Sequence, residues 1–432
     1  MREINIALLG FGTVGSGVAE VIRRNGKIIE DQIDCKLRIT HVLVRNTEKY
    51  RDLDILKDVV VTDDFNCVID AAPEIIIEVM GGIHPAKEYI FEALNHRINV
   101  VSANKDLVAL FGPEIMHTAT ENKVNFSCEA SVAGGIPILK PLHDSLAANQ
   151  IESIIGTVNG TTNFILSDMD DSGVSYSDAL RVAQKKGYAE ADPTNDVCGY
   201  DAARKLAILA SIGFRANVTF DDVLVEGIEK ISQKDIQYAS EMNYTIKLLA
   251  VAMRQENGIA LNVYPAFVPR SHPLASVKGS YNAIYVTGNI VEDVMFYGRG
   301  AGSLPTASAV MGDVISTAKH ILNHSTGTEM MLTETKRIPF YSSLKLKNAY
   351  YFRLLVDDMT GVLSQIAAAY ADNNISIREV VQKSRIEDAA ELMIITEETP
   401  RENIIHVEKA LQVLPCMRQV ANIIRVMDDG KR

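Results

Sequence analysis

A glycine-rich turn, Gly10-Phe11-Gly12-Thr13-Val14-Gly15, follows an almost entirely apolar run at residues 4–9 and opens a segment with helical periodicity. An apolar run of this kind is typical of a strand covered on both faces of a parallel sheet. In a dinucleotide-binding fold the glycines allow a tight turn, close approach of a pyrophosphate and close packing of helix on strand. The free N–H groups of the helix N-terminus would meet that pyrophosphate. The alternative is a glycine-rich turn without a ligand.

The second strand-like run, at residues 37–44, is followed by Arg45. Sites specific for NAD normally carry an acidic residue here, which binds the ribose 2′-hydroxyl. A guanidinium suits a 2′-phosphate instead, because its planar fork can pair two phosphate oxygens. We therefore expect NADP to be preferred, with NAD still possible. The alternative for Arg45 is a solvated arginine on a loop.

Two more strand-like runs, at residues 75–80 and 99–102, end in Gly81-Gly82 and in Ser102-Ala103-Asn104-Lys105. The carboxyl ends of strands in an open α/β sheet line the crevice where ligands bind. The pattern therefore predicts that Ser102 and Lys105 contact the cofactor or orient a substrate. The alternative for Lys105 is a surface lysine on a loop.

The middle of the chain begins with a stretch of small residues after Glu129, at residues 130–138. Such a stretch bares backbone carbonyls, and the carboxylate of Glu129 adds a charged oxygen, so a hard-cation site is one interpretation. A tight turn between domains is the other. A run of side-chain and backbone donors at residues 156–163 could hold a polar substrate such as an amino acid.

An acidic loop at residues 187–196 precedes an amphipathic helix predicted over 200–209. Asp201 and Lys205 are four residues apart and so share one face of this helix. The loop carries three carboxylates, at Glu190, Asp192 and Asp196. Three carboxylates are costly to bring together unless they hold a cationic group, and the α-ammonium of an amino acid would serve. The alternative for Asp201 and Lys205 is a surface ion pair worth under about 0.5 kcal/mol.

A second glycine-rich loop, at residues 298–303, leads into another predicted helix after Gly302. It follows three predicted strands, at residues 260–265, 283–287 and 293–297. We expect the chain to return to the first domain here, with the N–H groups of this loop closing over the cofactor.

Taken together and in this order, these segments resemble homoserine dehydrogenase. The matching pieces are residues 10–15, 102–105, 129–137, 156–164, 187–209 and 300–310. The long match at 187–209 is far more specific than the glycine turn. The resemblance implies NAD(P)-dependent interconversion of L-homoserine and L-aspartate 4-semialdehyde, on the route to threonine, methionine and isoleucine.

The resemblance also implies roles for individual residues. Lys205 falls on the family's proton-donating lysine and Asp201 on its partner. Glu190 and Asp196 fall on substrate-binding positions, and Lys105 lies at the junction of cofactor and substrate. The expected cofactor-binding residues are Gly10, Phe11, Gly12, Thr13, Val14, Gly15, Arg45, Ser102, Lys105 and Gly302.

A monovalent-cation loop is implied as well, with Glu129, Val132, Gly134 and Ile136 as its ligand positions and Na⁺ as the expected ion. Cys198 departs from the family pattern, in which many relatives carry Asp or Asn. This departure concerns the packing of the loop more than the chemistry.

The last eighty residues read as a separate module with the element order βαββαβ, a ferredoxin-like unit. Its first turn is Asp358-Met359-Thr360-Gly361-Val362-Leu363. This turn resembles that of an ACT domain, although Thr360 stands where many relatives have proline. The resemblance implies an amino-acid effector, with threonine as the hypothesis we prefer. A module that serves only oligomerisation is the alternative.

Length and composition set the limits of this interpretation. The 432 residues suggest about three domains. The net charge of −12 disfavours nucleic-acid and anionic-membrane partners and favours a small-molecule substrate. No apolar run approaches the roughly 18 residues of a membrane span. The five cysteines are scattered without CxxC spacing, which indicates a reducing compartment, so we expect a cytoplasmic protein.

The predicted architecture is therefore α/β, with three domains and one linker. These are a Rossmann-type dinucleotide-binding domain (1–130, completed by about 300–325), an α+β substrate and dimerisation domain (131–300), a linker (326–348) and a C-terminal ferredoxin-like ACT domain (349–432). Uncovered sheet edges favour a homodimer or homotetramer. The rival readings are a catalytically silent NADP-binding amino-acid sensor and an aspartokinase fusion, for which the chain has no room.

Overall fold

The computed structural model describes residues 2–327, 338–386 and 389–427. Its internal contacts divide the chain into two units of three segments each. The first comprises Met1–Ile154, Arg204–Asp222 and Asn282–Ile338; the second comprises Ile155–Ala203, Val223–Tyr281 and Pro339–Arg432. Much of the predicted linker, residues 328–337, lies outside the described residues, and the domain boundaries given above stay predictions.

The first unit is built on a parallel sheet of six strands in the order β3-β2-β1-β4-β5-β6. This is the doubly wound order of dinucleotide-binding domains, so the predicted fold class is confirmed. The strands are β1 (Arg2–Leu9), β2 (Cys35–Leu43), β3 (Val60–Thr62), β4 (Ile75–Glu78), β5 (Asn99–Ser102) and β6 (Phe126–Ser127).

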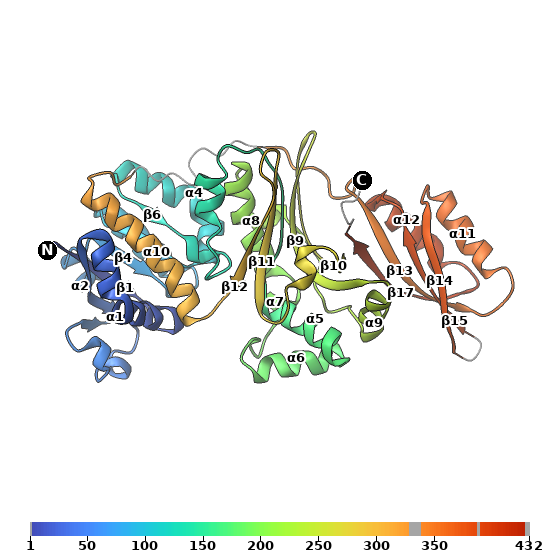
Figure 1. The fold of residues 1–432 in the computed structure, drawn as a ribbon, viewed down its shortest axis with the longest axis horizontal. Helices are drawn as coiled ribbons and strands as arrows, with labels where there is room; N and C mark the ends of the chain where they lie inside the picture. Colours follow the sequence, from blue (N-terminus) through green and yellow to red (C-terminus); the bar gives the residue numbers. More distant parts are fainter. Residues whose placement is uncertain (1, 328–337, 387–388, 428–432) are drawn as a thin grey trace. The chain divides into compact units, whose positions relative to one another are not determined.

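Two long helices cover one face of this sheet, where α1 (Thr13–Ile33) lies beside α10 (Ser303–Leu322) (Figure 1). Both bury apolar residues against Ile4, Ile6 and Leu8, which alternate along β1 and so point to the same face. The core thus joins segments almost 300 residues apart in the chain. The other helices of this part are α2 (Phe65–Asp70), α3 (Ala86–Asn95) and α4 (Lys105–Asn122).

Three further strands include residues of the first unit. They are β7 (Ile151–Thr157), β11 (Tyr281–Gly288) and β12 (Glu292–Arg299), with β11 between the other two. Strand β12 ends its sheet and exposes Met295 and Tyr297. The helix α8 (Tyr200–Phe214) begins in the second unit and continues in the first.

The second unit contains a long hairpin of β9 (Tyr244–Gln255) and β10 (Gly258–Pro269), with β8 (Leu224–Val225) parallel to β10. Nearly every residue of the hairpin is buried. Its helices, which carry most of the polar residues discussed below, are α5 (Gly160–Ser172), α6 (Tyr176–Lys185), α7 (Thr194–Val197) and α9 (Gln233–Glu241).

The C-terminal part of the second unit is ferredoxin-like, as predicted. Its main sheet has the order β17-β13-β15-β14, with all pairs antiparallel. The elements are β13 (Lys347–Asp357), α11 (Val362–Asp372), β14 (Ile377–Ile386), β15 (Ala389–Thr396), the short β16 (Thr399–Pro400), α12 (Arg401–Gln412) and β17 (Met417–Val426). Unforeseen by the sequence, β17 also pairs in parallel with β10 through Arg425 and Val426, so the two sheets of this unit are continuous.

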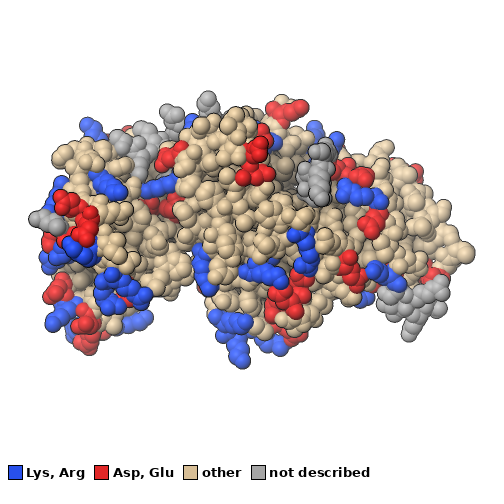
Figure 2. Space-filling view, in the orientation of Figure 1, with Lys and Arg blue, Asp and Glu red and all other residues tan. Residues whose placement is uncertain are grey.

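The charges on one face of the molecule can be compared with those of a polyanion-binding surface. On the face drawn in Figure 2, basic and acidic side chains alternate over short distances, and no continuous stripe of one sign is seen among the coloured residues. A polyanion-binding surface would concentrate Lys and Arg. No helix of the described part is long and apolar enough to cross a membrane.

Candidate active site

A cavity of about 490 Å³ opens at the carboxyl ends of β1, β2 and β4. Its lining includes Gly10, Phe11, Gly12 and Arg45 among the predicted cofactor residues. Gly10 has a φ of +100°, which favours glycine, and a side chain at Gly15 would come within 2.2 Å of the Gly10 carbonyl oxygen. The glycines thus serve the turn and the packing for which the sequence analysis assigned them.

The same cavity fits a dinucleotide. A Cβ at Gly12 would meet nothing within 4 Å, so it would project into open space where a pyrophosphate can approach the backbone. Phe11 packs edge-on against Tyr50, with ring centroids 5.6 Å apart, and both line the cavity. Arg45 is exposed at its edge and forms no ion pair within the described part of the chain, which suits a 2′-phosphate.

The other predicted cofactor residues do not line this cavity. Thr13 and Val14 belong to the first turn of α1. The segment that follows Gly302 reaches that turn, because the Ser303 hydroxyl donates a hydrogen bond to the Thr13 carbonyl at 2.7 Å. Ser102 ends β5, and Lys105 begins α4.

A buried carboxylate, Glu78, organises the ends of β4 and β5. It is fully buried and accepts hydrogen bonds from the Ser102 hydroxyl (2.6 Å) and the Met80 N–H (2.9 Å). Asn104 extends this network by donating to the Gly82 carbonyl at 2.6 Å, and it also caps α4 in front of Lys105. Burial raises the pKa of Glu78, against the hydrogen bonds that lower it.

Glu78 was missed by the sequence analysis. The signal was present, since Glu78 is a single acidic residue inside the otherwise apolar run at 75–80. A charge in such a place must be hydrogen-bonded, and so it holds its neighbours in place.

The second cluster is centred on Asn159, the N-cap of α5. Its side-chain amide donates to the carboxylates of Asp196 (2.6 Å) and Asp201 (2.9 Å), while its oxygen accepts from the Thr162 N–H. Two predicted site residues are therefore brought together by an amide that carries no charge. Asp201 is 5% exposed, and the helix it begins contains Lys205 one turn further on.

The three carboxylates of the predicted acidic loop differ in their contacts and exposure. Asp192 accepts hydrogen bonds from the Thr194 N–H and hydroxyl, and so it organises the start of α7. These bonds lower the pKa of Asp192. Glu190 is exposed, and its backbone carbonyl accepts from Gln184. Of the three, only Asp196 shares a donor with Asp201.

The two predicted lysines occupy neighbouring stretches of the first unit. Arg204, the residue before Lys205, forms an ion pair with Asp106, the residue after Lys105, at 3.3 Å. This contact joins α8 to the first turn of α4, the helix that Asn104 caps.

The predicted cation loop uses its carboxylate differently from the expectation. Glu129 is buried in a short 3₁₀ turn (Glu129–Ser131), and its carboxylate accepts N–H groups from Ile138, Leu139 and Lys140 at 2.5–2.8 Å. The carboxylate therefore caps the following turn. The other oxygen ligands that this loop could offer a cation are its backbone carbonyls. Gly134 in this loop adopts the left-handed conformation (φ +50°). Groups of three or more acidic, His or Cys side chains suited to a metal are absent from the described residues.

The parallel sheet, its glycine turn and the polar clusters define the class of protein, a dinucleotide-binding oxidoreductase with an added regulatory-type domain. The family models agree. Residues 10–129 match the NAD-binding domain of homoserine dehydrogenase, residues 137–315 match homoserine dehydrogenase, and residues 350–416 match the ACT domain.

Full-length relatives give the same result. The chain is 38% identical over 432 residues to homoserine dehydrogenase of Bacillus subtilis, covering 100% of both chains, and 39% identical to that of Neisseria gonorrhoeae, covering 99% of both. A crystal structure of a homoserine dehydrogenase from Thiobacillus denitrificans superposes with a TM-score of 0.93 at 38% identity, covering 99% of each chain. An archaeal homoserine dehydrogenase solved with NADPH covers 73% of this chain and 98% of its own, with a TM-score of 0.63 at 28% identity. The chain belongs to the homoserine dehydrogenase family, and it is an oxidoreductase with a C-terminal ACT domain.

Proposed function

We propose that this enzyme interconverts L-homoserine and L-aspartate 4-semialdehyde with NADP, and that Lys205 is its proton donor. The observation that carries this proposal is the Asn159 cluster. A neutral amide holds Asp196 and Asp201 side by side at the start of the helix that continues to Lys205. This arrangement orients two acidic groups at the start of α8, where an amino-acid substrate could meet them, and a silent sensor would not need a proton donor beside them.

Each residue then has a defined task. When bound, the dinucleotide supplies a hydride from C4 of its reduced nicotinamide ring. As the aldehyde carbon gains this hydride, its oxygen becomes an alkoxide, and the Lys205 ammonium gives that oxygen a proton. The reverse reaction returns the proton to Lys205. Glu190 and Asp196 bind the substrate ammonium, and Lys105 orients the substrate beside the cofactor.

The decisive experiment is Lys205→Ala. Loss of general acid–base catalysis should lower kcat for homoserine oxidation by about 10²–10⁴-fold. NADP affinity, measured by fluorescence titration, should be unchanged. Lys319→Ala, on an exposed turn of α10, is the matched control and should keep full activity. Survival of activity in the Lys205 variant would show that the proton comes from elsewhere.

Sodium is proposed as a resident ion of the loop formed by Glu129, Val132, Gly134 and Ile136. Because the Glu129 carboxylate is engaged by three N–H groups, the loop would bind the ion through backbone carbonyls, which suit a hard cation. Homoserine oxidation in NaCl should exceed that in choline chloride at equal ionic strength. If the oxidation rate and the thermal stability of the enzyme were the same in NaCl and in choline chloride, the proposed sodium site would be wrong.

The remaining expectations concern the cellular setting. We propose a cytoplasmic role in threonine, methionine and isoleucine biosynthesis, with threonine acting as a feedback effector through the ACT domain. Five free cysteines support a reducing compartment. The exposed Met295 and Tyr297 on the edge strand β12 support a homodimer or homotetramer, which light scattering after size exclusion can test.

A further inference from the structure

The buried carboxylate of Glu78 lies directly behind the wall of the dinucleotide cavity. Its Oε1 accepts hydrogen bonds from the Met80 N–H at 2.9 Å and the Gly81 N–H at 3.3 Å, and both of these residues line the cavity. Its Oε2 accepts from the hydroxyl of Ser102, the opposite residue on β5, at 2.6 Å. Glu78 itself is fully buried, so only the backbone of the lining residues separates its carboxylate from the cavity.

These contacts fit the ionised form of Glu78, because all three present a hydrogen atom to it. A carboxylate has only acceptor sites, whereas a protonated carboxylic acid would turn its own hydrogen against one of the donors. Burial raises the pKa of Glu78, and the hydrogen bonds oppose this rise. A positive charge in the cavity would favour the ionised form further.

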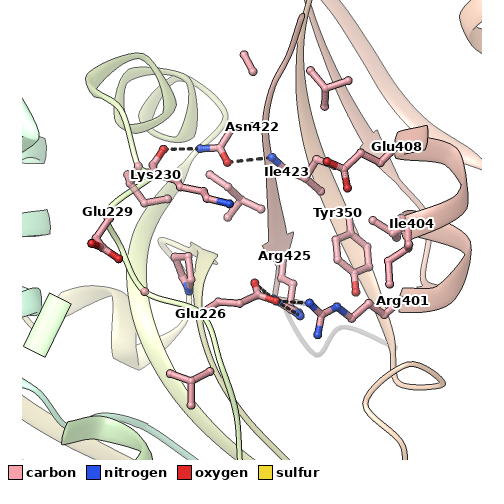
Figure 3. Close-up of a pocket in the computed structure, with 18 residues that line it drawn as sticks. Glu226, Glu229, Lys230, Tyr350, Arg401, Ile404, Glu408, Asn422, Ile423 and Arg425 are labelled. Atoms are coloured by element: carbon pink, nitrogen blue, oxygen red, sulfur yellow. Dashed lines mark hydrogen bonds and ion pairs between the residues drawn. The ribbon is translucent and has the colours of Figure 1, made fainter. Parts of the chain in front are cut away.

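The charge of Glu78 is not balanced by a cation of the protein. Within the residues that the structure describes, Glu78 forms no ion pair. Asp313 is buried to a similar extent, but its carboxylate lies 3.1 Å from a lysine ammonium. Even the partly exposed Glu226 is bound by Arg401 at 2.6 Å and by Arg425 at 2.7 Å (Figure 3). Buried charges are normally paired, so positive charge from a ligand would complete the surroundings of Glu78.

The place of Glu78 in the sheet puts it in the half of the crevice that receives the nicotinamide nucleotide. A doubly wound sheet binds a dinucleotide across the point where the strand order reverses, with one nucleotide on each half. In the order β3-β2-β1-β4-β5-β6, β1 and β4 meet at this point. Arg45, the residue expected at the ribose 2′-phosphate, comes shortly after β2 in one half. Glu78 and Ser102 end β4 and β5 in the other half.

We propose that the negative charge of Glu78 stabilises the oxidised, positively charged nicotinamide ring relative to the reduced, neutral ring. A charge near the ring of a cofactor changes its redox properties. The Ser102 hydroxyl and two backbone N–H groups hold this charge in place before the cofactor binds. When hydride leaves C4 with its electron pair for the aldehyde carbon, the ring gains one positive charge, so Glu78 favours reduction of the aldehyde. The choice of NADP rests on the proposed function.

Fluorescence titration of the full-length enzyme with NADP⁺ and with NADPH, at pH 8.5 and without homoserine, tests this effect. Glu78→Gln removes the charge and keeps the size of the side chain. The Kd for NADP⁺ divided by the Kd for NADPH should rise about tenfold, because only the oxidised ring loses an attractive charge. Glu74→Gln, just before the amino end of β4, is the matched control and should keep the wild-type ratio.

A second pair of variants separates charge from shape. Glu78→Asp and Glu78→Asn shorten the side chain equally, so they disturb the hydrogen bonds of Met80, Gly81 and Ser102 to a similar extent. Only the first keeps the charge. Both variants should bind NADPH more weakly than the wild type, but the ratio of the two Kd values should be about tenfold higher in Glu78→Asn than in Glu78→Asp. This comparison tests the charge even if circular dichroism shows that Glu78→Gln does not fold.

A purely structural role of Glu78 would give a different result. If Glu78→Gln and Glu78→Asn weaken the binding of NADP⁺ and NADPH by the same factor, the charge does not act on the ring and the proposed effect is wrong. A ratio that rises in these variants but not in Glu74→Gln supports it. Since no turnover is measured, the result does not depend on whether Lys205 is the proton donor. A wild-type enzyme that binds neither NADP⁺ nor NADPH would overturn the proposed function together with the effect of Glu78.

Discussion

Two buried cations of the second unit, Lys247 and Arg353, have opposite surroundings. Lys247 on β9 is 2% exposed and donates to the side-chain oxygen of Asn163 (2.9 Å) and to the Val277 carbonyl (2.5 Å), which are both neutral. Arg353 on β13 binds the carboxylates of Asp235 (2.8 Å) and Glu391 (3.2 Å). One charge is held by dipoles and the other by countercharges.

The pKa values follow this difference. Burial lowers the pKa of Lys247 to about 8, because the neutral acceptors do not offset the free-energy cost of removing the ammonium from water. Burial also opposes the charge of Arg353, but Asp235 and Glu391 outweigh it and raise its pKa. Burial alone would raise the pKa of Glu391, yet Tyr238, Lys234 and Arg353 lower it.

The two cations differ in whether their buried charge is compensated. Lys247 donates to the neutral side chain of Asn163, which lies one turn after Asn159 on α5, the helix that Asn159 caps. The Arg353 cluster instead joins α9 to the ACT domain through compensated charges. We infer that the stability of the first region depends on pH above about 8 and that the stability of the second does not.

The largest expected effect is the loss of Arg353. Arg353→Met leaves two carboxylates buried without their shared cation, which should lower the free energy of unfolding by about 3–5 kcal/mol. Urea denaturation followed by circular dichroism measures this change. Arg378→Met, which removes an exposed pair with Glu397, should cost less than about 1 kcal/mol. Equal losses in the two variants would remove the distinction drawn above.

Lys247→Met tests the other side of the comparison through pH. The unfolded chain keeps this proton up to a pKa near 10.5, whereas the folded chain releases it near 8. Unfolding therefore takes up a proton between these values, and the free energy of unfolding of the wild type should rise with pH in that window. Relative to Lys247→Met, the rise from pH 8 to pH 10 should be about 2 kcal/mol. A flat difference between the two proteins would mean that Lys247 is charge-compensated in the folded state.

Asn159→Ala tests whether the hydrogen bonds of the Asn159 amide position the carboxylates of Asp196 and Asp201 for the substrate. Without its amide, Asp196 and Asp201 lose their common donor, and kcat/KM for homoserine should fall about tenfold, or about 1.4 kcal/mol in transition-state stabilisation. Ser175→Ala removes another N-cap, that of α6, and controls for the cost of capping. Both variants should lose about 1 kcal/mol of stability, but only the first should lose activity.

An effect of the same size, on cofactor choice alone, is expected at Arg45, an exposed cation at the edge of the dinucleotide cavity. Arg45→Ala should reduce the preference for NADP over NAD by roughly tenfold, because a guanidinium hydrogen bond to a phosphate is lost. Steady-state kinetics with each cofactor measure the ratio. Arg51→Ala, which breaks an exposed pair with Glu48, should leave it unchanged.

Local patterns predicted much of this molecule correctly. The apolar run at 4–9 with the glycine turn predicted β1, the turn and α1, because each depends on residues close together in sequence. The C-terminal βαββαβ order was likewise visible from its periodicity. The use of Asp192 in a local turn could not be predicted, since it depends on the backbone path around Thr194.

By itself the sequence determined the class of fold, the family and the identity of the residues that carry charge. Only the tertiary structure decided which charges meet neutral partners and which meet countercharges. The Asn159 amide donates a hydrogen bond to Asp201, 42 positions away in the chain, and the Ser102 hydroxyl donates one to Glu78 on the neighbouring strand. The Arg425 guanidinium donates to Glu226, 199 positions away. The physical reason is that an electrostatic environment depends on distance in space and on burial, neither of which is a property of neighbouring residues in the chain.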